Sequence, residues 1–168
     1  MRIFKTTVQA ALAGALVMAA SVASANEIRP GCYERIYSSG HLATHPDQHV
    51  AAIRMKVGEW ATNVSRATQL EAVMANQGRA RGTRYAGRTL SQFLFCGTEG
   101  RWDTCVVGCD VGSLQVTKQT NTSMTFRTRY LLVGEVADCG GEIDLAEIPG
   151  QWVSYKLNRA PDSACNGM

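Results

Sequence analysis

The chain has 168 residues, of which 45% are hydrophobic and 18% are charged, and its formal net charge is +3. Its 17 basic and 14 acidic residues become 15 and 14 once Arg2 and Lys5, within the first 25 residues, are set aside. A balance this close to neutral argues against nucleic acid as a partner. The length suits a single domain with one hydrophobic core, and no internal repeat or low-complexity tract divides the chain.

The first 25 residues have the pattern of a secretory signal peptide. Arg2 and Lys5 make a basic start, an apolar stretch follows over 8–20, and Ala23-Ser24-Ala25 provides a small-residue cleavage site. Removing 25 of the 168 residues leaves a mature chain of 143. The signal is the only apolar segment near membrane-spanning length. We therefore predict 1–25 as a signal peptide and 26–168 as a single secreted β-rich domain without a membrane span.

The first half of the mature chain mixes helix and strand signals. A turn of helix is expected at 38–44, because Pro46 disfavours helix at the residue before it. The segment 50–57 alternates apolar and polar side chains, which is typical of a half-buried strand. Apolar side chains at helical spacing predict a helix over 67–76, with Gly78 as its C-terminal stop.

The second half is dominated by strand signals. A Gly-Thr-Glu-Gly turn at 97–100 joins apolar segments at 91–96 and 102–107 into a predicted hairpin. Further alternating segments lie at 114–116, 124–130 and 152–157, with Asn121-Thr122 as a turn. The fold class is therefore mostly β: a small antiparallel β-barrel or sandwich of six to eight strands with one or two short helices, stapled by disulfides.

All six cysteines follow the predicted signal: Cys32, Cys96, Cys105, Cys109, Cys139 and Cys165. Cys96 and Cys105 lie on either side of the 97–100 turn and can face each other across the hairpin. Cys32 and Cys165 can clamp the two ends of the mature chain, which leaves Cys109 with Cys139. This is one of the many pairings that six cysteines allow. A labile redox pair and a metal cluster are the alternatives, although Cys-x₃-Cys is not the spacing of thioredoxin-like sites or common zinc motifs.

The three histidines, His41, His45 and His49, are four residues apart, and on an unbroken helix their rings would share one face. Such a face can bind zinc or copper. Pro46 interrupts the helix, and Pro46-Asp47 is typical of a turn. No metal site is favoured, and imidazoles that pack or cap a loop are the simpler interpretation. A metal centre, or a metal-dependent enzyme, using His41, His45 and His49 is the alternative.

An arginine segment and an acidic segment carry opposite charges. The arginine segment holds Arg79, Arg81, Arg84 and Arg88, with Tyr85 as a stacking surface. On a strand, Arg79 and Arg81 would share a face, and so would Arg84 and Arg88. These side chains can bind an anionic glycan, a phosphate or an acidic protein loop. A solvated strand edge, where charge discourages aggregation, is the simpler interpretation.

The acidic segment comprises Glu135, Asp138, Glu142, Asp144 and Glu147. Its spacing matches no EF-hand calcium loop. We expect it either to pair with the arginine segment or to form an exposed loop.

Several short stretches resemble a group of small secreted proteobacterial proteins that contain cysteines and have no assigned activity. They are 32–37 (Cys-Tyr-Glu-Arg-Ile-Tyr), His41-Leu42-Ala43, 45–48 (His-Pro-Asp-Gln), 105–110 (Cys-Val-Val-Gly-Cys-Asp) and Cys139-Gly140-Gly141. This resemblance implies a periplasmic or secreted protein of a Gram-negative bacterium. More distantly, 152–157 is similar to a strand of the periplasmic inhibitors of C-type lysozyme, which are also small cysteine-stapled barrels.

No Gly-x-Ser-x-Gly nucleophile or other catalytic motif is present, so an enzymatic activity stays open while a binding role is favoured. We predict a non-enzymatic periplasmic binding or inhibitory module for a protein or glycan partner of the cell envelope, with no cofactor. The binding residues would be Arg79, Arg81, Arg84, Tyr85 and Arg88. The alternatives are the histidine metal site and a purely structural envelope protein.

Overall fold

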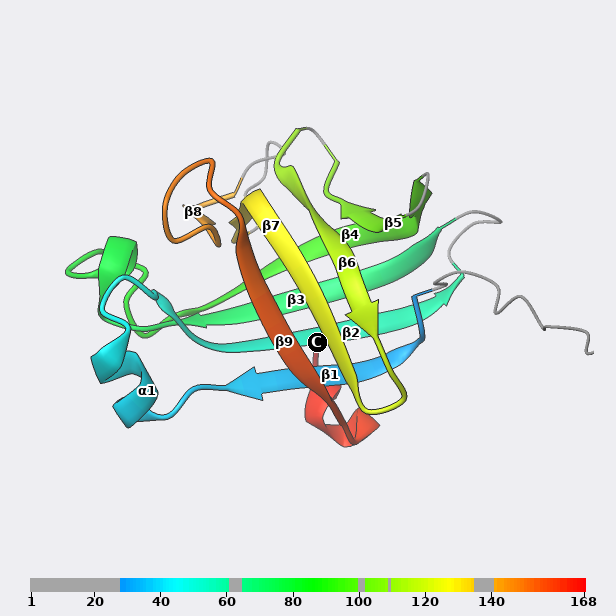
Figure 1. Cartoon of the computed structure of the whole chain (residues 1–168), viewed down its shortest axis with the longest axis horizontal. Coiled ribbons are helices and arrows are strands. Elements are labelled where there is room, and N and C mark those ends of the chain that lie inside the picture. Colours follow the sequence, from blue (N-terminus) through cyan, green and yellow to red (C-terminus); the bar gives the residue numbers. More distant parts are fainter. Residues whose placement is uncertain (1–27, 61–64, 100–101, 109, 135–140) are drawn as a thin grey trace, which may run out of the picture.

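A computed structural model of the chain describes residues 28–60, 65–99, 102–108, 110–134 and 141–168. The predicted signal peptide and the cysteines Cys109 and Cys139 lie outside these residues. Figure 1 shows the elements of the described part. In chain order they are β1 (Gly31–Ile36), α1 (Ser39–Thr44), β2 (Val50–Trp60), β3 (Arg66–Met74), η1 (Gly78–Ala80), β4 (Thr89–Glu99), β5 (Trp102–Val106), β6 (Gly112–Gln119), β7 (Ser123–Val133), β8 (Ile143–Asp144), β9 (Val153–Ala160) and η2 (Asp162–Cys165).

Eight of these strands close into an antiparallel barrel. The order around the barrel is β1, β2, β3, β4, β5, β6, β7 and β9, and β9 returns to pair with β1. The two-residue strand β8 lies outside the closed ring and pairs with β7. In Figure 1, β6, β7 and β9 pass in front of β1 to β4. The predicted mostly-β fold is confirmed, and closure of the sheet makes it a barrel rather than a sandwich.

Alternation along the strands sends every second side chain into the barrel. Each of the eight strands contributes fully buried side chains to this interior: Tyr33, Met55, Leu70, Leu94, Cys105, Leu114, Phe126 and Tyr155. An eight-stranded barrel is just wide enough for side chains to fill it. The interior is therefore a hydrophobic core, and binding must be sought on the outside of the barrel and at its ends.

The helix predicted over 67–76 is wrong, because this segment forms β3. The side chains of Thr68, Leu70, Ala72 and Met74 are buried in strict alternation, which is a period of two. Strand β3 pairs on both sides, with β2 and with β4, so its backbone hydrogen bonds go to its neighbours. The short helix expected at 38–44 is confirmed as α1, and the Ser38 side chain caps it by accepting from the His41 amide at 3.2 Å.

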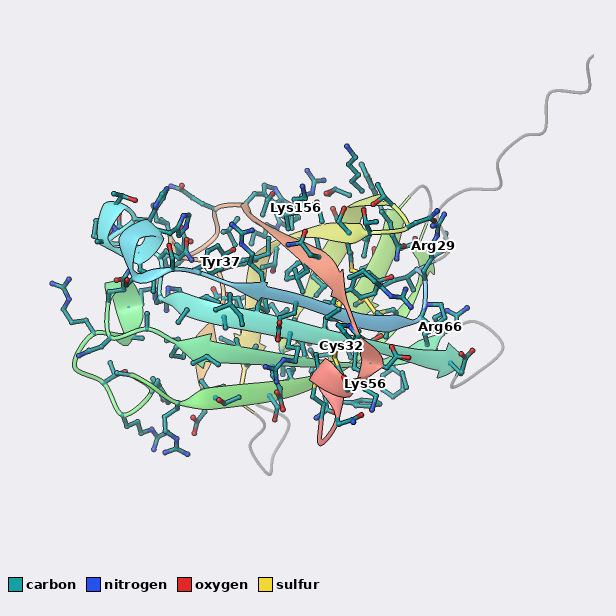
Figure 2. The ribbon with its side chains drawn as sticks, turned by 90° about the horizontal axis from the view of Figure 1, so that it is seen from below. Arg29, Cys32, Tyr37, Lys56, Arg66 and Lys156 are labelled. Atoms are coloured by element: carbon teal, nitrogen blue, oxygen red, sulfur yellow. A yellow bond between two sulfur atoms is a disulfide. The ribbon has the colours of Figure 1, made fainter. Side chains whose placement is uncertain are left out.

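Two of the three predicted disulfides are present. Cys96 and Cys105 are directly opposed in the β4–β5 hairpin and are bonded to each other. Cys32 and Cys165 are bonded across a sequence separation of 133 residues, which ties η2 to the outside of β1. Figure 2 shows Cys32 beside the red C-terminal segment. The third predicted pair, Cys109 with Cys139, falls outside the described residues.

Candidate functional site

The arginine segment lies in the loop between β3 and β4, so the expected strand placement is wrong. The loop opens at Gly78, which has a left-handed φ of +51°. A Cβ at Gly78 would lie 2.3 Å from the carbonyl oxygen of Asp47. The Gly78 amide instead donates to the Pro46 carbonyl at 3.0 Å, which docks the loop against the turn after α1. A glycine at this position lets the chain fold back rather than extend.

The exposed Arg79 extends to the acidic segment. Its Nη1 lies 3.8 Å from Asp144 Oδ2 and donates to the Ala146 carbonyl at 3.3 Å. Asp144 is buried, and its Oδ1 accepts the backbone amides of Leu131 and Ala146, each at 3.0 Å. Arg79 therefore helps to hold the β8 segment against the barrel, which is a structural role.

Arg84 also pairs with the acidic segment, at the surface. Its Nη2 lies 3.2 Å from Glu142 Oε1, and its guanidinium lies 5.1 Å from the centre of the Tyr85 ring. The Tyr85 hydroxyl and then Glu142 raise the pKa of Arg84 above its ordinary value. Arg81 and Arg88 are exposed. The expected pairing of the two segments is thus present at Glu142 and Asp144, and it engages half of the predicted binding arginines.

The rings of the three histidines are not arranged to bind one metal ion together. The His45 ring stacks on the His41 ring at 4.1 Å, and His45 Nδ1 donates to the His41 carbonyl at 2.8 Å. His41 Nε2 lies 3.0 Å from Gln48 Oε1. His49 is fully buried and donates from Nε2 to the Asp144 carbonyl at 2.8 Å. Among the residues that the structure describes, no group of three or more His, Cys, Asp or Glu side chains is arranged to hold a metal ion.

A mixed-charge pocket of about 420 Å³ lies at the end of the barrel where η2 packs. Lys56, Glu59, Arg159 and Asp162 are among its lining residues, and all four are exposed. Figure 2 shows Lys56 beside the C-terminal segment. Since both signs of charge line this open pocket, it offers no clear preference for an anionic or a cationic ligand.

The outside of the barrel over β5, β6, β7 and the start of β9 holds a stack of rings and guanidinium groups. We call it the indole–arginine cluster: Trp102, Arg127, Arg129 and Trp152. The Arg127 guanidinium lies 4.4 Å from the Trp152 ring centre and 5.4 Å from that of Trp102. The Arg129 guanidinium lies 5.5 Å from the centre of the Trp152 ring, and Trp152 is 48% exposed. Arg127 Nε and Nη2 both donate to Gln115 Oε1, at 3.1 and 3.0 Å.

Three of the strands under this cluster, β6, β7 and β9, carry positively charged residues and no acids. Neither β6, β7 nor β9 contains Asp or Glu, whereas Lys118, Arg127, Arg129, Lys156 and Arg159 lie on them. On the neighbouring strand β5, the one acid is Asp103, which is buried and accepts from the Thr98 hydroxyl at 2.9 Å.

The opposite side of the barrel is different. On β1, β2 and β3, Arg54 lies between two carboxylates, 2.8 Å from Glu34 and 3.7 Å from Glu71. Arg54 is thus paired with acids on one side of the barrel, whereas β6, β7 and β9 on the other side contain no acid.

The sequence patterns did not reveal this cluster. Its members come from two strands, β5 and β7, and from the residue before β9. They meet because Gln115 on β6 pairs with Arg127 on β7, which in turn pairs with Ser154 on β9. The available signal was the run of strands without acids over 112–133 and 153–160. That signal becomes a surface only when the sheet closes.

No protein-family model, curated protein or solved structure matches this chain. No helix in the described part of the chain has the length and apolar character needed to cross a membrane. What the protein does must therefore be argued from its own surface.

Proposed function

We propose that this protein is a non-enzymatic binding or inhibitory module, secreted or periplasmic, that engages an anionic partner of the cell envelope through the indole–arginine cluster. The observation that carries the proposal is the Arg127 guanidinium beside two tryptophan rings, on a face where β6, β7 and β9 contain no acid. Signal-like residues at the N-terminus and two disulfides support an oxidising compartment outside the cytoplasm.

The geometry of Arg127 suits recognition of a carboxylate. Its two hydrogen bonds to Gln115 use the edge formed by Nε and Nη2, and none of the described residues engages Nη1. Stacking on Trp102 and Trp152 holds the guanidinium plane in place. A group that is already ordered loses little conformational entropy on binding, so more of the interaction energy appears as affinity.

The described groups with clearly shifted pKa values are not candidates for acid–base catalysis. Within the described residues, clearly shifted pKa values belong to Tyr37, Arg84 and Tyr155, and all three are raised. A tyrosine or arginine with a raised pKa stays protonated near neutral pH. Such groups do not supply the acid or base poised near pH 7 that general acid–base catalysis uses.

The arginine segment is a weaker candidate for the binding site than the indole–arginine cluster. Arg79 and Arg84 are already paired with acids of this chain, whereas β6, β7 and β9, which include the strand of Arg127 and Arg129, contain no acid. A partner at the arginine segment would have to compete with Asp144 and Glu142.

The test is binding of two anionic polymers, poly-L-glutamate and polygalacturonate, followed by NMR chemical-shift mapping and calorimetry at two salt concentrations. We expect binding that weakens with salt, with shifts on β6, β7 and β9. The double substitution Arg127→Gln/Arg129→Gln should lower affinity by about tenfold or more, which is about 1.4 kcal/mol or more.

The matched control is Arg81→Gln/Arg88→Gln, which removes the same charge from the arginine segment. It should leave the affinity within about twofold, a change of less than 0.5 kcal/mol by the same conversion. Loss of binding in the control, with shifts in the β3–β4 loop, would return the site to the arginine segment. No binding of either polymer at low salt would refute the proposal.

A further inference from the structure

We infer that the partner is a protein segment that presents carboxylates next to apolar side chains. This inference rests on the proposed function, and it follows from a second feature beside the indole–arginine cluster. We call that feature the apolar row: Phe93, Phe95, Val106 and Tyr130. Each of its four residues is between 40% and 45% exposed.

The apolar row crosses four neighbouring strands. Phe95 on β4 pairs with Val106 on β5, Val106 with Ser113 on β6, and Ser113 with Tyr130 on β7. The Phe93 and Phe95 rings contact each other edge to face, with centres 5.2 Å apart. Cross-strand neighbours on one face lie about 5 Å apart, so Phe95 and Val106 are adjacent, and Tyr130 follows across the small polar Ser113.

A shift in strand register brings Tyr130 to this outer strip. Between Ser113 and Gln115 the β6–β7 register slips by one residue, so that Ser113 faces Tyr130 instead of Arg129. Gly112 makes the slip possible, because a Cβ there would lie 2.2 Å from the Tyr130 carbonyl oxygen. Its φ of +109° also favours glycine. The bulge thus presents both Arg129 and Tyr130 at the surface.

The apolar row and the indole–arginine cluster lie side by side. Thr104 on β5 pairs with Gln115 on β6, two residues along the strands from the pair of Val106 and Ser113. Gln115 in turn pairs with Arg127 of the indole–arginine cluster. Two residues along a strand span about 7 Å. One partner of modest size therefore covers both features at once.

This combination fits a protein better than a glycan. Phenylalanine and valine make no hydrogen bonds to sugar hydroxyls, so the hydroxyls of a polysaccharide laid over Phe93, Phe95 and Val106 would lose hydrogen bonds to water. Protein interfaces are enriched in aromatic residues and arginine, which are the residue types of this face. The cationic strands then call for acidic residues beside the apolar ones on the partner.

The same surface does not suit insertion into a lipid membrane. The side chains of the apolar row are more than half covered by their neighbours, since their residues are at most 45% exposed. Interfacial membrane anchors bury a protruding apolar face about 5–10 Å deep. Half-covered side chains on a sheet do not reach that depth.

The test compares four probes at equal carboxylate or phosphate concentration: a random copolymer of glutamate and tyrosine, poly-L-glutamate, polygalacturonate, and vesicles that contain phosphatidylglycerol. We expect the glutamate–tyrosine copolymer to bind about tenfold more tightly than poly-L-glutamate, and both more tightly than the glycan and the vesicles.

Val106→Thr and Phe95→Thr should remove most of that tenfold advantage while leaving poly-L-glutamate binding unchanged. Val106→Thr keeps the β-branched shape, so it tests the surface even if Phe95→Thr affects folding. The matched control is Ile36→Thr, which removes an apolar side chain on β1 at a residue 65% exposed, outside this face. It should leave all affinities unchanged.

The outcomes separate the two proposals. Equal affinity for the copolymer and poly-L-glutamate, unaffected by Val106→Thr, would overturn the inference and leave the proposed function standing. Tighter binding of polygalacturonate or of the vesicles would also overturn it, in favour of a glycan or a membrane. Failure of every anionic probe to bind would overturn the proposed function and the inference together.

Discussion

At the scale of single residues, Tyr155 links the barrel core to the segment that contains β8. Its ring packs 5.4 Å from that of Phe126, and its hydroxyl donates to the Leu145 carbonyl at 2.8 Å. Burial, and then the nearby Glu147, raises the pKa of Tyr155 well above its ordinary value. The phenol must therefore stay protonated for the native structure to persist.

This arrangement predicts a loss of stability at alkaline pH. The unfolded chain ionises this tyrosine near pH 10, whereas the folded chain keeps it neutral. The free energy of unfolding is therefore constant below about pH 10 and falls as the pH rises toward the folded pKa. Urea unfolding of the wild type and of Tyr155→Phe between pH 8 and 11 measures this fall in the free energy of unfolding.

Tyr155→Phe should cost about 1–2 kcal/mol at pH 8, because the Leu145 carbonyl loses its hydrogen bond. It should also flatten the decline above about pH 10. The control is Tyr130→Phe, whose ring is exposed on the outer face. An equally steep decline in Tyr155→Phe would show that other groups cause the alkaline dependence.

At the scale of elements, the two disulfides act on very different lengths of chain. Cys96–Cys105 closes a hairpin over a separation of 9 residues, and Cys32–Cys165 joins the first strand to η2 over 133 residues. The four cysteines of these bonds are buried, so neither disulfide is exposed to solvent. A cross-link that spans more chain removes more entropy from the unfolded state.

We predict that the paired substitution Cys32→Ala/Cys165→Ala destabilises the protein more than Cys96→Ala/Cys105→Ala. The chain-entropy relation gives about 5 kcal/mol for the long loop and about 2.6 kcal/mol for the short one. Urea unfolding of the two variants measures the difference. Equal or reversed losses would mean that native contacts near the hairpin, rather than unfolded-chain entropy, set the contribution of each bond.

At the scale of the whole molecule, closure of the sheet separates a filled interior from a functional exterior. Side chains from all eight barrel strands meet inside, and Phe126 and Tyr155 are among the largest of them. Two phenylalanines therefore lie in opposite settings: Phe126 is buried inside the barrel, and Phe93 is 40% exposed on the apolar row.

Phe126→Ala should lower the free energy of unfolding by about 3–5 kcal/mol, because the interior has no means of collapsing onto the space left. Phe93→Ala should cost less than about 1.5 kcal/mol and instead weaken binding of the glutamate–tyrosine copolymer. Thermal unfolding and the binding assay together make the comparison. Similar stability losses in both variants would contradict the assignment of inside and outside.

Much of the fold was accessible from local patterns. The alternation at 50–57 and the placement of Cys96 and Cys105 on the two strands of one hairpin depend on neighbours in the chain, and both are confirmed. The turn predicted at 97–100 is wrong, because residues 97–99 continue β4 and pair with β5. The segment 67–76 shows the limit of such patterns. Its apolar residues satisfy both a helical and a strand period, and only the pairing of β3 with β2 and β4 decides between them.

The sequence by itself determined the strand-rich composition, the short helix and the opposition of Cys96 and Cys105 in one hairpin, because these features depend on residues close together in the chain. Only the tertiary structure selected Cys165 as the partner of Cys32, among the pairings that six cysteines allow. Only the tertiary structure decided that Arg79 and Arg84 pair with the acidic segment. It also decided that Trp102, Arg127 and Trp152 stack on one face. Those contacts join segments far apart in the chain, and they exist only because the eight strands close into a barrel.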